Sequence, residues 1–371
     1  MASPTTPTPM GSASPTEGTP APAGEDDDGQ GQSLHHKENE KVPWSPEIWK
    51  AIHRTVHDET MRVRVGAKFL PHRRVHPKTT SVPPDTITNG PVSNEQNFTL
   101  TIDEGITIRL NEIWTEFALT TQQVHDTSEA KNPMHTSAVS LARRAAQYLA
   151  LAQDIVIFQG FTGYTASPFF AQNVRFRTPL PADSGLLSQS ASPITGLNPY
   201  LSPNAPIQVQ PLTDGAPGVR YGENTFTAVT QGYAVLNAQG QPGPYALILN
   251  TTPYADLYAA VGNGSLVITA DRVEPLVKAG LFGTSTIPPN PALPPSSPPT
   301  SPPSSPPNLG GPPYYGVLVS IGGDTMDLVV GLHATTVFMQ QDTNQLWRFR
   351  VLERFALRVL DTSAIQVLQF N

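Results

Sequence analysis

Apolar residues recur at helical spacing in two stretches of the N-terminal half. The first stretch opens with Ser45-Pro46-Glu47, an N-cap followed by a proline and an acid that suit the first turn. It predicts an amphipathic helix over 46–61, followed by an extended basic arm through residue 78. The second stretch is Ala-rich, has a broad apolar face and predicts a long helix over 134–159, ended by Gly160.

Strands are indicated by alternating or continuous apolar runs elsewhere. The stretch from Phe98 to Arg109 alternates, and Asn89-Gly90 is a hairpin-turn signal, so a long two-stranded projection is predicted there. In the C-terminal half we expect strands over 245–250, 316–321, 327–332 and 335–340, with a last pair over 345–359 and 364–370. Helices are expected over 226–236, 253–261 and 271–279.

The strand over 345–359 carries arginines on one face and apolar residues on the other. Such alternation predicts one buried face and one face that is either solvated or interfacial. An arginine face of this kind suits solvent, a subunit contact or an anionic partner. The four arginines are Arg348, Arg350, Arg354 and Arg358.

Three segments have no hydrophobic period. Residues 1–42 are rich in Pro, Thr, Ser and acids, residues 166–225 form a long insertion, and residues 288–313 are a Pro/Ser tract. We expect a disordered tail, a loop-rich insertion and a semi-stiff linker, respectively. The chain holds 40 prolines, no cysteine and a net charge of −7, so disulfides and thiolate metal sites are excluded. The acidic tail lies beside a basic segment over 43–78, which suits electrostatic self-association or simple solvation.

No enzyme motif emerges from the chain. The nucleophile elbow, the phosphate-binding loop and the dinucleotide fingerprint are all lacking. His53 and His57 share a helix face, but Arg54 stands where a metalloprotease has glutamate, so a polar face is the simpler interpretation. The basic arm has few interleaved aromatics, and specific nucleic-acid binding is not expected. No apolar run approaches the length of a membrane span, and we expect a cytoplasmic protein.

Four stretches together carry a family resemblance. They are 43–70 with Gly66-Ala67-Lys68-Phe69; 117–119 leading to 141–146 and 152–160; 243–254; and 316–331 with 354–360. In order and spacing they resemble the encapsulins, shell proteins with the capsid fold of tailed phages (the Hong Kong 97 type). The resemblance implies an α+β fold with a P-domain, an E-loop and an A-domain, assembled as an icosahedral homo-oligomer around a cargo enzyme.

The division that this resemblance implies covers the whole chain. It is 1–42, tail; 43–78, first helix and arm; 79–112, E-loop; 113–165, P-domain with its spine helix; 166–225, insertion; 226–287, A-domain; 288–313, Pro-rich loop; and 314–371, C-terminal strands of both domains. The pore loop at the vertex would include Gly262, Asn263, Gly264 and Ser265, which bear no charge.

The resemblance also places the cargo-docking surface on the first helix, where a cargo's C-terminal loading peptide would bind. The candidates by position are Trp49, Ile52, Val56, Phe69 and Leu70. Ala67 replaces a usual arginine and Pro71 a common acid, so residues for charge pairing with that peptide are not in place. Gln122 stands where flavin-binding members have tryptophan, and no cofactor is expected.

Two functions remain open within this fold, and one outside it. The first is an encapsulin shell around a ferritin-like, iron-storing enzyme or a peroxidase that acts in oxidative stress. An acidic tail in its lumen would attract iron or tether a basic cargo. The second is a phage or prophage major capsid protein that packages DNA. The third possible function, outside this fold, is a hydrolase. The sequence offers no set of catalytic residues that would support it.

Overall fold

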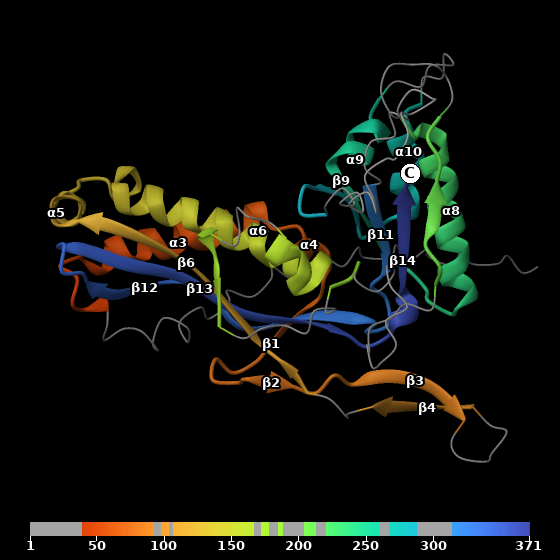
Figure 1. Cartoon of the computed structure of the whole chain (residues 1–371), viewed down its shortest axis with the longest axis horizontal. Helices are drawn as coiled ribbons and strands as arrows, with labels where there is room; N and C mark the ends of the chain where they lie inside the picture. Colours follow the sequence, from red (N-terminus) through yellow and green to blue (C-terminus); the bar gives the residue numbers. More distant parts are fainter. Residues whose placement is uncertain are drawn as a thin grey trace, which may run out of the picture.

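Two five-stranded sheets, each packed against helices, carry the described part of the chain (Figure 1). The computed structural model describes residues 39–91, 98–103, 107–166, 172–177, 185–187, 204–212, 220–259, 267–287 and 314–371. The first sheet lies under two long helices, and the second stands at the other end of the molecule. One continuous apolar core joins them, because it includes residues of both sheets.

The first sheet has the strand order β1-β12-β13-β6-β7. Its strands are β1 (His72–Arg74), β6 (Asn111–Thr120), β7 (Arg175–Phe176), β12 (Met326–Gln341) and β13 (Leu346–Val359). Helices α3 (Pro46–Val63) and α6 (Ser137–Ala166) cover one face. Small buried side chains such as Ala142 and Ala146 bring α6 close to its neighbours. Shorter helices lie nearby: α4 (Gly66–Phe69), α5 (Thr121–Ser128) and the 3-10 turn η1 (Pro133–His135).

The second sheet has the order β10-β9-β11-β14-β8. Its strands are β8 (Ile207–Val209), β9 (Tyr245–Asn250), β10 (Gly280–Thr284), β11 (Tyr314–Ser320) and β14 (Ile365–Phe370). It packs against α8 (Gly222–Ala238), α9 (Thr251–Leu257) and α10 (Thr269–Val273), with 3-10 turns η2 (Glu274–Leu276) and η3 (Thr362–Ala364). Residues 314–371 therefore supply strands to both sheets.

A two-part ribbon projects below the first sheet (Figure 1). Its base pairs β2 (Ser81–Val82) with β5 (Ile108–Arg109), and its outer part pairs β3 (Thr86–Pro91) with β4 (Phe98–Asp103). The predicted projection is confirmed, but the predicted turn is wrong. Asn89 pairs with Leu100 and Gly90 with Thr99, since the ladder continues through the dipeptide and its bonds override the local turn preference.

Three further predictions of elements are corrected. The strands expected over 327–332 and 335–340 are the single strand β12, whose bulges interrupt the alternation that marks a strand. The strands over 345–359 and 364–370 do not pair with each other: β13 lies in the first sheet and β14 in the second. The helix expected over 271–279 ends at Val273, because Pro275 cannot continue it, and Gly280 begins β10 instead of closing a helix.

The long predicted helix is confirmed, and its predicted stop is a kink after which α6 continues to Ala166. Gly160 interrupts α6 with a φ of 67°, a left-handed conformation that glycine adopts at little cost. The N-terminal helix also begins where predicted, with Pro46 in its first turn, although the Ser45 side chain makes no capping bond.

Candidate functional site: the arginine face of the first sheet and the first helix

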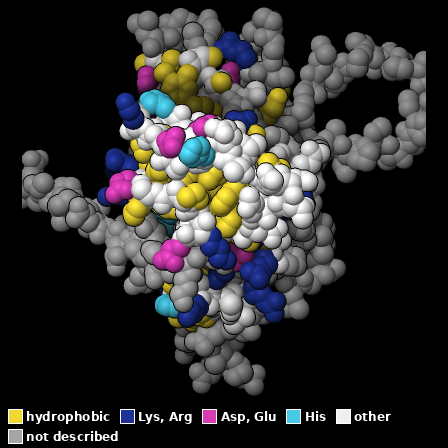
Figure 2. Space-filling view, turned by 90° about the vertical axis from the view of Figure 1, so that its left-hand side faces the viewer, with side chains coloured by type: hydrophobic (Ala, Val, Ile, Leu, Met, Phe, Trp, Pro, Cys, Tyr) yellow, Lys and Arg dark blue, Asp and Glu magenta, His cyan; other side chains and the backbone are white. Residues whose placement is uncertain are grey.

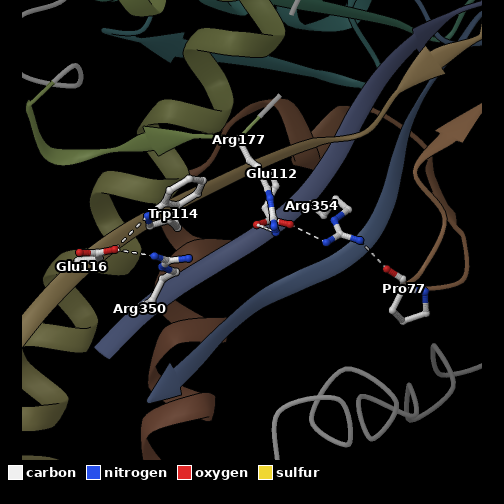
Figure 3. A network of polar contacts seen from close by, with 7 residues as sticks. All are labelled: Pro77, Glu112, Trp114, Glu116, Arg177, Arg350 and Arg354. Carbon is white, nitrogen blue, oxygen red and sulfur yellow. Dashed lines mark hydrogen bonds and ion pairs between the residues drawn. The ribbon is translucent and has the colours of Figure 1, made fainter. Parts of the chain in front are cut away.

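Every arginine of the β13 face meets a carboxylate of the same subunit. Arg350 lies over the ring of Trp114 at 4.6 Å and donates to Glu116 at 2.8 Å (Figure 3). Exposure falls along the strand, from 45% for the side chain of Arg348 to 5% for that of Arg358. The face is therefore neutralised within the subunit. The four pairs are Arg348 with Asp342, Arg350 with Glu116, Arg354 with Glu112, and Arg358 with Asp327 and Asp85.

Glu112 lies at the centre of a second polar contact on this face. Arg354 donates to its Oε2 at 2.5 Å and Arg177 to its Oε1 at 3.3 Å (Figure 3). Arg354 also donates to the carbonyl oxygen of Pro77, at 2.7 Å. The Arg354 guanidinium thus links the Glu112 carboxylate of the sheet to the backbone of the arm that leads to the ribbon.

A buried ionic cluster lies on the opposite face of the same strand. The Arg64 guanidinium stands 4.0 Å from a carboxylate oxygen of Glu353, and both side chains are at most 3% exposed. Burial raises the pKa of Glu353 to about 7, and the neighbouring Asp154 adds to the rise while Arg64 opposes it. One oxygen of Glu353 has no hydrogen-bond partner among the described residues, which also favours the protonated form. Sequence alternation places Glu353 among apolar neighbours, and that break was the available signal for this cluster.

Asp154 stabilises the turn between helices α3 and α4. Its two carboxylate oxygens accept hydrogen bonds from the backbone amides of Val65 at 2.7 Å and Gly66 at 2.8 Å. Burial nevertheless raises the pKa of Asp154 to about 7. A side chain at Gly66 would put its Cβ 2.6 Å from the Cδ1 of Ile157, so the Ile157 side chain would have to shift to admit it.

The five cargo-docking candidates are placed mostly inside the subunit. Ile52, Val56, Phe69 and Leu70 lie in the apolar core. Trp49 is half-buried and keeps an accessible edge. Its ring lies 5.1 Å from that of Trp44, and the His53 ring stacks on it at 5.8 Å. Burial lowers the pKa of His53 to about 4, so the stacked imidazole is neutral at physiological pH.

The departures from the family pattern lie at the surface or near it. Ala67 is half-buried, and the carbonyl of exposed Pro71 accepts from the amide of Leu328, which guides β1 onto β12. Gln122 is exposed on α5 and donates to Asp126 at 2.7 Å. Within the described ranges, no group of His, Asp and Glu side chains is arranged to hold a metal. The pore-loop candidates Gly262 to Ser265 lie outside the described residues.

The basic arm presents fewer free charges than its sequence suggests. Arg64 is buried, Arg62 pairs with Glu59 at 2.5 Å, and Arg73 lies 3.9 Å from Asp85. Lys and Arg side chains still gather in the lower part of the face in Figure 2, at the height of β1 and β2 in Figure 1.

Among the helices that the structure describes, none has both the length and the apolarity of a membrane span.

Comparison with known proteins supports the class that the motifs indicated. Residues 208–293, which include helices α8, α9 and α10 and strands β9 and β10, match the model of a family described as "Encapsulating protein for peroxidase". No curated protein is similar to this chain in sequence.

One solved structure shows the fold, and two others align at lower TM-scores. The virus-like particle from Pyrococcus furiosus aligns with a TM-score of 0.52 at 14% identity, over 86% of this chain and 98% of that chain. The capsid of Myoviridae phage XM1 aligns at 0.48 and 13% identity, over 83% and 92%. The SrpI encapsulin complex from Synechococcus elongatus aligns with a TM-score of 0.45 at 13% identity, over 81% of this chain and 85% of that chain.

The chain thus has the α+β fold of Hong Kong 97-type shell proteins, and the predicted fold class is confirmed. The fold and the family-model match together support an encapsulin-like shell protein. The boundaries drawn for the P-domain, E-loop and A-domain stay predictions.

Proposed function

We propose that this chain is the self-assembling subunit of an encapsulin-type shell that encloses a cargo enzyme. The observation that carries the proposal is the shell-protein fold combined with the match of residues 208–293 to an encapsulating-protein family. Of the two cargo types that the sequence suggested, a peroxidase is the one named in that family's description, and it is the cargo proposed here.

The projecting ribbon supports assembly. Strands β3 and β4 pair with each other and extend away from both sheets (Figure 1). Ile102 on β4 is 63% exposed, and contact with another surface would bury it. A neighbouring copy of the chain would supply that cover in a closed, symmetric shell.

The cargo contact is assigned to the accessible edge of Trp49 on α3. The other four docking candidates lie in the core, where they hold α3 in place and cannot meet a peptide without unpacking. An aromatic edge beside a neutral imidazole suits an apolar side chain of a loading peptide. Docking of this kind relies on apolar contact rather than on charge, in keeping with Ala67 and Pro71.

Electron microscopy and size-exclusion chromatography of the recombinant full chain test assembly. Uniform round shells are expected, and a monomer at micromolar concentration would contradict the proposal. Nuclease-protected DNA inside the shells would favour the phage-capsid function instead.

Co-expression with a peroxidase that ends in a loading peptide tests cargo docking. Trp49→Ala is expected to lower the peroxidase content per shell severalfold, while the exposed neighbour Lys50→Ala leaves it unchanged. Equal loading of both variants in intact shells would remove Trp49 from the docking surface.

A further inference from the structure

A polar hollow of about 540 Å³ lies where the ribbon joins the first sheet. Thr80, Ser81, Thr107 and Arg109 line it from the base of the ribbon. Glu112 and Arg354 line it from adjacent strands of the sheet, and Arg177 follows β7. Its volume falls in the range of small-molecule sites and leaves room for a hydrated ion.

The hollow carries more positive than negative charge. Three guanidinium groups line it, against the single carboxylate of Glu112. That carboxylate already accepts from Arg177 and Arg354. The backbone of Arg109 pairs with Ser81, but its exposed side chain makes no hydrogen bond or ion pair with any part of the chain that the structure describes. Arginine keeps its charge at every accessible pH, so two positive charges remain uncompensated in the hollow.

We propose that this hollow binds a small polyvalent oxyanion, such as a free phosphate group. The guanidinium groups of Arg109 and Arg177 suit planar, paired donation to oxyanion oxygens, and the hydroxyls of Thr80, Ser81 and Thr107 offer further donors. Glu112 would repel the anion, and its two existing partners offset that repulsion.

Binding would fasten the ribbon to the sheet. Arg109 lies on β5 at the base of the ribbon, whereas Arg177 follows β7 of the sheet. An anion held by both arginines therefore bridges the ribbon and the sheet, beside the existing contact of Arg358 on β13 with Asp85 before β3. The bound anion reduces the motion of the ribbon base and presents it in one orientation.

Calorimetric titration of the full chain with inorganic phosphate, at constant ionic strength set by NaCl, tests the proposal. Saturable binding of one phosphate per chain is expected, and Arg109→Ala and Arg177→Ala should each weaken it about tenfold. The control is Arg54→Ala on α3, a comparably exposed arginine paired with Asp58. Arg109 has no partner to lose and Arg177 is 71% exposed, so both variants should fold.

Amide hydrogen exchange gives a second readout. Phosphate is expected to slow exchange at residues 107–112 in the wild-type chain and not in Arg109→Ala. A wild-type chain without saturable phosphate binding, or three variants that bind equally, would overturn the site. Binding of a single-stranded oligonucleotide without binding of phosphate would assign the charge to nucleic acid. Loss of phosphate binding when shells assemble would indicate that a carboxylate of a neighbouring copy occupies the hollow. Either this result or the oligonucleotide result would also overturn the proposal.

The proposed shell function and this site can fail independently. Shells that form but bind no phosphate refute only the anion site, and a monomer that binds phosphate refutes only the shell.

Discussion

Replacing Glu353 with glutamine tests the electrostatics of the buried cluster between the first helix and the sheet. The cluster holds two carboxyl groups, Glu353 and Asp154, and one guanidinium, Arg64, with all three groups buried. When both carboxyl groups are ionised, the cluster has a net negative charge in a medium that solvates it poorly. Burial therefore raises both pKa values to about 7.

The direction of the pH effect follows from linkage. A carboxyl group whose pKa is higher in the folded than in the unfolded state binds its proton more tightly when folded. Folded-state stability is then lost as the pH rises from 4.5, the ordinary value for Glu353, through about 7. One pKa unit corresponds to about 1.4 kcal/mol, so the ionised Glu353 costs at most about 3 kcal/mol at pH 8.

Glu353→Gln removes that cost without changing the shape of the side chain. At pH 5 the native Glu353 is already protonated, and the variant should have nearly the native stability. At pH 8 the variant should be more stable by up to about 3 kcal/mol, seen as a rise of several degrees in the unfolding temperature of purified protein.

Asp154→Asn serves as the contrasting variant. Asp154 has a raised pKa too, but its two oxygens accept backbone hydrogen bonds, and an amide nitrogen would face one of those donors. We expect this variant to be destabilised at both pH values. If Glu353→Gln were instead destabilised at pH 8, its ion pair with Arg64 would outweigh the burial cost and the reasoning would be refuted.

Three further substitutions test the packing and the ion pairs. Gly66→Ala should lower the unfolding free energy by about 1–3 kcal/mol, because its Cβ would stand 2.6 Å from Ile157. Denaturant titration measures this loss, and an unchanged unfolding midpoint would show that the turn between α3 and α4 can shift. Arg358→Met should lower the unfolding free energy by about 3 kcal/mol in the same assay, since it leaves Asp327 and Asp85 without their buried partner. Arg348→Met is the control at the exposed end of the strand, and it should change the unfolding free energy by less than about 1 kcal/mol.

The contact between Gly66 and Asp154 shows how separate sequence motifs come together in the fold. Gly66 and Asp154 belong to separate stretches of the family resemblance, and nothing in their sequence context relates one to the other. The structure brings them together through a 2.8 Å hydrogen bond across 88 positions. The resemblance indicated that both motifs matter, while the contact between them needed the fold.

The docking candidates show the opposite case. Periodicity correctly placed Ile52 and Val56 on the apolar face of a helix, but a helical face can meet a partner or the protein's own core. Here α6 and the sheet cover that face, and Trp49 alone among the five candidates keeps an accessible edge. Burial depends on which elements pack together, so a local pattern cannot separate the two outcomes.

Local pattern by itself determined the long helices, most strands, the interruption at Gly160 and the collinear motifs of a shell protein, because spacing and backbone preference act over a few residues. Tertiary structure alone decided which strands pair, that Asn89-Gly90 continues a strand, and that each arginine of β13 meets a carboxylate of its own subunit. It also decided that Arg109 and Arg177 line one hollow. Those outcomes depend on long-range contacts and on the loss of water around charges, which residues distant in sequence settle only once the chain has folded.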